Sequence, residues 1–236
     1  MPEKFQDYWD KNIDLWGEKY LDISHGHEKF NRPAWFTAAY NATIGQLERK
    51  LMKERYRRTI ELMDLHVKPG SVFSDLGCGT GIFVVEAAKR GASVNAIDFS
   101  ESALASTRRN VEANVPGANV KYVQADLQNV DNLPESDVSL AMGVTPYLTS
   151  IDQFTKEALS KTHILCVQYT DPYNWASIVR KMIPALDVRS LQCYDPEYVD
   201  GLYTQHRGLL YDRRKFASGF IDQVFNIEKI PAQEIG

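Results

Sequence analysis

Short apolar runs alternate with amphipathic stretches between residues 71 and 169. The apolar runs are rich in β-branched and aromatic residues and predict strands at residues 71–76, 93–98, 120–126, 137–142 and 163–169. Stretches with helical spacing lie between most of them, near residues 80–90, 101–114 and 151–160. Strands that alternate with helices form right-handed parallel crossovers, so this pattern predicts an α/β fold whose sheet is covered on both faces.

Residues 1–68 contain no strand-like run and predict a helical cap in front of the sheet. Within this cap, residues 44–63 have helical spacing, with one side formed by Ile44, Leu47 and Leu51 and the opposite side by Lys50, Lys53 and Arg57. A solvated face is the simplest explanation of the charged run in this helix, and an anion or membrane site is the alternative. Arg55 lies near the apolar side, where it can extend to solvent or pair with a carboxylate.

From residue 172 the chain is irregular and rich in tyrosine, and strand character returns at residues 208–212 and 224–230. We therefore predict a core domain at residues 69–236. Within it, residues 172–207 are expected to form a lid over the substrate, inserted after the fifth strand.

Composition restricts the class of protein further. A chain of 236 residues with 44% hydrophobic residues suits one α/β domain with a small cap. Its formal net charge of −4 argues against nucleic acid as a partner, because phosphate contacts need a surplus of lysine and arginine. The three cysteines have no C-x-x-C spacing, so neither a disulfide framework nor a zinc site is indicated. The charged start and the absence of a long apolar run predict a cytoplasmic protein without a membrane partner.

The stretch FSDLGCGTGIF at residues 73–83 forms the turn from the first predicted strand into the first helix. In an open parallel sheet, ligands bind at the carboxyl ends of the strands, which places this turn at the binding edge. A P-loop would need lysine and then serine or threonine after the last glycine, where Ile82 and Phe83 stand. A dinucleotide fingerprint would need a third glycine at position 82, so the case for a pyrophosphate ligand is weakened as well.

The remaining pattern, D-x-G-x-G-x-G, resembles the first motif of class I S-adenosylmethionine-dependent methyltransferases. It is formed by Asp75, Gly77, Gly79 and Gly81, with Cys78 inside the loop, and the resemblance extends over roughly residues 70–170. It implies a doubly wound fold with a mostly parallel seven-stranded sheet, S-adenosylmethionine as cofactor and S-adenosylhomocysteine as product. The methionine end of this cofactor carries an ammonium group, near which a carboxylate at Asp75 can organise the site, and glycines let the backbone approach the ligand.

A second acidic residue, Asp98, ends the second predicted strand 23 positions after Asp75. An acidic residue near this position accepts hydrogen bonds from ribose hydroxyls in related α/β folds. The resemblance implies the same role for Asp98 and places Phe99 beside the adenine. Taken alone, Asp98 could also be an ordinary helix cap or turn residue.

Two further segments match the family's cofactor site. The resemblance implies that Asp126 accepts from the adenine amino group while the backbone amide of Leu127 contacts a ring nitrogen, although a loop aspartate is the simpler alternative. Met142 and Gly143, at the end of the fourth strand, match the segment that lines the methionine moiety.

Methyl transfer from a sulfonium is an in-line displacement, so the protein has to align acceptor and methyl group and exclude water. A hydroxyl acceptor usually needs a base, whereas a neutral amine does not. Many small-molecule members of the family carry histidine in a run such as GVLHYL, but this chain reads GVTPYL with Pro146 at that position. Tyr147 is the nearest polar aromatic residue for orienting the acceptor, with a packing role as the alternative, and the candidate bases are His25, His27 and His206. No metal site is predicted, because the His25–His27 pair lacks an accompanying cysteine or carboxylate pattern.

Aromatic residues gather in two segments. Seven of the twelve tyrosines lie between Tyr147 and Tyr211, and three of the four tryptophans lie in the cap. If the segments meet above the cofactor, they form a cavity for a flat or apolar small molecule or a sugar; the alternative is that they pack as an ordinary cap core.

We therefore predict a methyltransferase acting on an oxygen or nitrogen atom of a small molecule, and a homodimer is left open. A protein or RNA acceptor is disfavoured. The acidic balance argues against RNA, and no signature like asparagine-proline-proline-tyrosine follows the fourth strand to indicate a planar amine of a base or of glutamine. The alternatives are a non-methylating enzyme with the same cofactor and a non-catalytic binding subunit.

Overall fold

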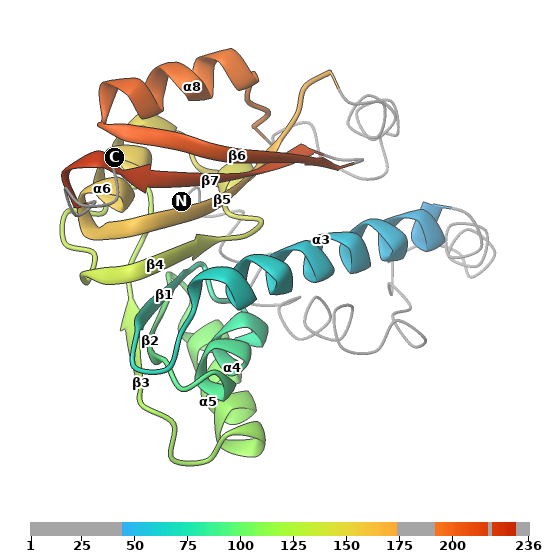
Figure 1. Cartoon of the computed structure of the whole chain (residues 1–236). Helices are drawn as coiled ribbons and strands as arrows, with labels where there is room; N and C mark the ends of the chain where they lie inside the picture. Colours follow the sequence, from blue (N-terminus) through green and yellow to red (C-terminus); the bar gives the residue numbers. More distant parts are fainter. Residues whose placement is uncertain (1–43, 174–191, 217–218, 230–236) are drawn as a thin grey trace.

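A seven-stranded sheet forms the centre of the molecule, in the order β3-β2-β1-β4-β5-β7-β6 (Figure 1). The structure, a computed structural model, describes residues 44–173, 192–216 and 219–229. The strands are β1 Val72–Leu76, β2 Ser93–Asp98, β3 Val120–Gln124, β4 Ser136–Ala141, β5 Thr162–Thr170, β6 Gly208–Phe216 and β7 Gly219–Asn226. The first five strands pair in parallel and β7 runs antiparallel to both β5 and β6, which confirms the predicted fold class.

Helices cover both faces of the sheet. They are α3 Ile44–His66, α4 Ile82–Lys89, α5 Glu101–Asn114, α6 Ile151–Lys161 and α8 Pro196–Gln205, with short 3₁₀ turns η1 Thr145–Tyr147 and η4 Ile227–Lys229. One apolar core lies beneath α3, α4 and α5, and a second lies beneath α6 and α8. None of these described helices is long and apolar enough to cross a lipid bilayer.

The last strand begins earlier than its apolar pattern indicates. β7 starts at Gly219, whereas the apolar pattern predicts a start at residue 224. The pattern fails there because Asp222 and Gln223 are polar but are both buried in the sheet. Asp222 is fully buried, and its carboxylate accepts hydrogen bonds from Tyr203 of α8 at 3.0 Å and from Arg213 of β6 at 2.8 Å. A buried polar residue is tolerated where its hydrogen bonds are made, so this strand could not be bounded from apolar periodicity alone.

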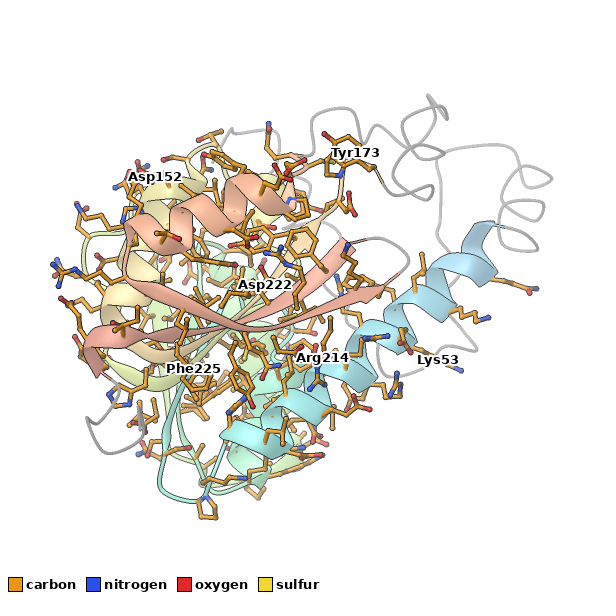
Figure 2. The ribbon with its side chains drawn as sticks, turned by 45° about the horizontal axis from the view of Figure 1, so that its top comes forward. Lys53, Asp152, Tyr173, Arg214, Asp222 and Phe225 are labelled. Carbon is orange, nitrogen blue, oxygen red and sulfur yellow. The ribbon has the colours of Figure 1, made fainter. Side chains whose placement is uncertain are left out.

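The same hydrogen-bond network fixes α8 on the β6–β7 hairpin. Tyr203 also bonds to the hydroxyl of Tyr169 on β5, at 3.1 Å, and Arg213 reaches Asp200 of α8 at 2.6 Å. Figure 2 shows Asp222 between α8 and the hairpin. Residues 196–205 of the predicted lid therefore form a helix that packs on the sheet, whereas residues 174–191 lie outside the described residues.

α3 lies across the other face and is anchored at its carboxyl end. His66 Nε2 lies 2.7 Å from Gln223 Oε1 of β7, and Glu61 pairs with Arg214 of β6 at 3.5 Å. Figure 2 shows Arg214 between β6 and this helix, and Figure 1 shows that the amino-terminal turns of α3 extend past the sheet. The remainder of the predicted cap, residues 1–43, lies outside the described residues.

Candidate functional site

The turn between β1 and α4 requires glycine at two positions. Gly77 and Gly81 have φ angles of +83° and +79°, which side chains disfavour. A Cβ atom at Gly77 would lie 2.4 Å from Val144, and one at Gly81 would lie 2.5 Å from Thr107. The loop is therefore packed tightly against the segment after β4 and against α5.

Hydrogen bonds fix the loop to the end of β2. The amides of Gly77 and Cys78 both donate to the carbonyl of Ile97, at 2.8 and 3.0 Å. The Gly79 amide donates to Oδ2 of Asp98 at 2.9 Å, and the Gly79 carbonyl accepts from Thr107 at 2.9 Å. The loop conformation is thus held by the protein itself before any ligand arrives.

Asp98 is buried at the carboxyl end of β2 and faces this loop. Its Oδ1 accepts from the amide of Ser100 at 3.0 Å, while its Oδ2 accepts from Gly79. A carboxylate has about four lone-pair sites, so these two backbone bonds are compatible with further hydrogen bonds from a vicinal diol. The predicted ribose-binding role therefore fits the geometry of this residue.

Asp75, the first residue of the motif, is 2% exposed, and its Oδ2 has no hydrogen-bond partner among the described residues. Burial, together with the nearby Asp98 carboxylate, raises the pKa of Asp75 to about 8. Buried carboxyl oxygens are normally paired. A cation or hydrogen-bond donor bound beside the loop would satisfy this oxygen, and the ammonium end of the expected cofactor has that chemistry.

The third predicted acidic residue, Asp126, lies beside the end of β2, where Asp98 stands. Ala125 donates its amide to the carbonyl of Asp98 at 2.9 Å, which joins the end of β3 to the end of β2. Asp126 then turns the chain by accepting from the amide of Gln128 at 3.1 Å. Leu127 is buried, and its Cδ1 lies 4.0 Å from the Cβ position at Gly77. The structure therefore brings the Asp126 turn next to the glycine loop.

Two residues at the end of β4 complete the predicted cofactor set. Met142 is buried, and Gly143 follows it with a φ angle of +77°. Phe99, predicted to lie beside the adenine, is half-buried directly after Asp98, and its carbonyl accepts from Gln124 at 3.1 Å.

Arg55 of α3 lies beside two of these elements, a placement that sequence reasoning did not predict. Its Nη1 lies 3.3 Å from the Cβ position at Gly143 and 3.2 Å from Oε1 of Gln168 on β5. The only signal in the sequence was its position near the apolar side of the helix, which does not say what the side chain meets.

The segment that contains the predicted acceptor-orienting residue is fixed to residues 192–194. The carbonyl of Pro146 accepts from the amide of Gln192 at 2.8 Å, and the carbonyl of Leu148 accepts from the hydroxyl of Tyr194 at 3.0 Å. Tyr147 lies between these two contacts, half-buried in η1. Its place just after β4 puts it at the same edge as the glycine loop.

Of the three histidine candidates, the structure describes His206. His206 follows α8, and its Nε2 lies 2.8 Å from Asp152 at the start of α6, which places it at the junction of these two helices. His25 and His27 lie outside the described residues. Within the described ranges no group of three or more histidine, cysteine or acidic residues is arranged to hold a metal ion.

The chain is similar to known methyltransferases in sequence and in structure. Residues 73–166 match a family model described as a methyltransferase domain. The structure is similar to that of magnesium protoporphyrin IX methyltransferase from Synechocystis PCC 6803 with bound SAH, with a TM-score of 0.71 and 14% sequence identity over 95% of this chain and 100% of that chain. It is also similar to the N-methyltransferase NodS from Bradyrhizobium japonicum WM9, with a TM-score of 0.57 and 13% identity over 74% of this chain and 87% of that chain.

Curated relatives match over shorter stretches. A ribosomal protein L11 methyltransferase of Oceanobacillus iheyensis is 41% identical over 70 residues, which is 29% of this chain and 22% of that protein. A protein of Pyrobaculum calidifontis named "Probable cobalt-precorrin-6B C(15)-methyltransferase (decarboxylating)" is 34% identical over 108 residues, which is 44% of this chain and 55% of that protein. The match thus spans about a fifth to just over half of the length of these relatives.

Proposed function

Because the chain carries the domain and the fold of the class I S-adenosylmethionine-dependent methyltransferases, we propose that it transfers a methyl group from this cofactor to an oxygen or nitrogen atom of a small molecule. The observation that carries the proposal is the cluster at the carboxyl ends of β1 and β2. There the glycine loop is bonded to Asp98, and the buried Oδ2 of Asp75 on the strand before the loop has no partner within the described ranges.

In the proposed site each acidic residue meets one part of the ligand. Asp98 accepts from the ribose hydroxyls, Asp126 accepts from the adenine amino group, and Asp75 offers its buried oxygen to the ammonium group at the methionine end. When bound, the cofactor supplies an electrophilic methyl group on a sulfonium. These contacts together are how this chain would hold the methyl group in line with an acceptor.

Many small-molecule methyltransferases have a histidine just after the fourth strand, but this chain has Pro146 at that position, and Pro146 is buried. We assign Tyr147 the role of orienting the acceptor through its hydroxyl. This arrangement suits an acceptor whose attacking atom already has a lone pair, since such an acceptor needs alignment more than it needs a base.

A small-molecule acceptor is supported by the acidic balance of the chain and by the name of the Pyrobaculum calidifontis relative, which refers to a cobalt-precorrin. A protein acceptor is the second candidate, because several relatives are named for ribosomal protein L11. The match covers 22% and 39% of two such relatives, so most of each chain has no counterpart in the matched stretch.

The test is calorimetric titration of S-adenosylhomocysteine into the wild type, Asp98→Asn and the control Asp131→Asn, whose carboxylate is exposed before β4. We expect roughly micromolar affinity for the wild type and the control, and a loss of more than about tenfold, or about 1.4 kcal/mol, for Asp98→Asn. No binding by the wild type would contradict the proposal and favour a non-catalytic subunit. Formation of S-adenosylhomocysteine from S-adenosylmethionine in the presence of an acceptor would exclude the non-methylating alternative.

A further inference from the structure

Asp75 and Asp98 are two buried acidic residues on one face of the sheet. The parallel pairing of β1 with β2 sets Asp75 opposite Ala96, and Asp98 follows Ala96 by two positions. Side chains alternate along a strand, so Asp98 points to the same side of the sheet as Ala96 and Asp75. Because Asp75 is 2% exposed and Asp98 is 6% exposed, the two carboxyl groups share an interior that contains little water.

The two carboxyl groups differ in the hydrogen bonds that they accept. Asp98 accepts from the backbone amides of Gly79 and Ser100, at 2.9 and 3.0 Å, and such bonds favour its ionised form. The Oδ2 of Asp75 accepts from no donor within the described ranges. An unpaired charge in the interior is costly, and a carboxylate next to it adds repulsion, so Asp75 is the member of the pair that keeps a proton.

The elements packed around Asp75 contribute apolar or uncharged side chains to the same core. Leu140 lies opposite Asp75 on β4, and Leu104 belongs to α5. In the glycine loop Cys78 is buried. Burial, followed by Asp98 and Asp75, raises the pKa of its thiol well above the usual value, so this group is neutral as well.

The cation that α3 brings to this edge of the sheet is bonded elsewhere. Arg55 donates through Nη1 to Gln168 on β5, which is separated from β1 by β4. Burial, followed by the Asp98 carboxylate, raises the pKa of Asp75 to about 8. A neutral Asp75 at neutral pH thus agrees with the hydrogen bonds and the burial of the group.

We propose that the ammonium group of the cofactor displaces the proton of Asp75, so that the protein releases one proton to the solvent when the cofactor binds. This inference rests on the proposed function. In this step the O–H bond of the carboxyl group breaks, the proton passes to the buffer, and the new carboxylate pairs with the ammonium group, which keeps its own protons. The affinity for the cofactor therefore rises by about tenfold for each pH unit below pH 8 and becomes constant above it.

The first measurement counts protons in the wild type by calorimetry. S-adenosylhomocysteine is titrated at pH 7 in phosphate and in Tris, two buffers that differ in their enthalpy of ionisation, and the difference between the observed enthalpies gives the number of protons released. We expect about one proton for each ligand bound. 5′-Methylthioadenosine has the same nucleoside and a thioether but no ammonium group, so we expect it to bind without proton release.

The second measurement uses variants. Asp75→Asn keeps the shape of the side chain and cannot lose the proton, so we expect it to bind S-adenosylhomocysteine without proton release. Its affinity is expected to change less than about twofold between pH 6 and pH 7, where the wild type gains about tenfold. Asp131→Asn is the matched control, because it removes an exposed carboxylate and is expected to release the proton like the wild type.

Three results would overturn the proposal. The first is binding of S-adenosylhomocysteine to the wild type without proton release. The second is equal proton release with 5′-methylthioadenosine, because the ammonium group would then not be the cause. The third is proton release that persists in Asp75→Asn, which would assign the proton to another group. The first two comparisons use the wild type alone and do not depend on the folding of a variant. Failure of the wild type to bind S-adenosylhomocysteine at either pH would instead contradict the proposed function itself.

Discussion

The buried carboxyl group of Asp75 predicts a measurable pH dependence of stability. In the folded protein, burial and then the nearby Asp98 raise its pKa from the ordinary 3.8 to about 8. Between these pH values the folded state keeps a proton that the unfolded state has released. The contribution of Asp75 to stability is therefore fully present below pH 3.8, falls as the pH rises, and is lost once the pH has passed about 8.

The size of the effect follows from linkage. One proton retained by the folded state lowers the free energy of unfolding by about 1.4 kcal/mol for each pH unit within this window. From pH 5 to pH 8 the loss amounts to about 3–4 kcal/mol, since the slope flattens as the pH approaches the folded-state pKa. Asp75→Asn keeps the shape of the side chain and removes the titration.

Urea denaturation of the cofactor-free protein at pH 5 and at pH 8 measures this difference. We expect the wild type to lose about 3–4 kcal/mol of unfolding free energy relative to Asp75→Asn between the two pH values. Asp131→Asn, which changes an exposed carboxylate, is expected to follow the wild type. Parallel pH profiles for the wild type and Asp75→Asn would refute the assignment of a neutral, buried carboxyl group at position 75.

Three further predictions address the loop, the hairpin and the acceptor side. Gly81→Ala places a Cβ atom 2.5 Å from Thr107 at a positive φ angle, so we expect a loss of about 2–3 kcal/mol in urea denaturation; an unchanged midpoint would contradict this. Tyr203→Phe removes the buried bond to Asp222 and is expected to cost about 1–2 kcal/mol, visible as a lower Tm, whereas an unchanged Tm would count against the network. Tyr147→Phe is expected to lower kcat about tenfold without changing S-adenosylhomocysteine affinity, and an unaltered kcat would remove its orienting role.

The parts of the fold that sequence predicted well depend on local pattern. The five parallel strands and their helices were found because apolar residues repeat along each element, and the glycine loop because its spacing is contained in seven consecutive residues. The start of β7 was predicted too late, because Asp222 and Gln223 are buried by virtue of partners on α8, β6 and α3. Those partners lie on other elements, so the residues next to Asp222 and Gln223 in the sequence do not predict that these two side chains are buried.

Arg55 shows the same limit at the site. A helical projection sorts residues by direction around the axis but does not say which part of the helix lies over the sheet. The amino-terminal turns of α3 pass the carboxyl ends of the strands, and a side chain that would be a surface charge elsewhere reaches Gln168 there. His206 is the opposite case: its bond to Asp152 depends on how α8 packs on α6, which the sequence around it does not specify.

Because α3 is anchored at its carboxyl end, a small rotation there moves the other end of the helix by a larger distance. Eleven positions separate Arg55 from His66, which is bonded to Gln223, and at 1.5 Å per residue this is an arm of about 16 Å. A tilt of about 4° around the anchored end moves the guanidinium group by about 1 Å, a displacement large enough to alter a reaction geometry. Substitutions at the contact between α3 and β7 can therefore shift the position of Arg55 at the edge of the sheet from a distance, without changing Arg55 or Gln168.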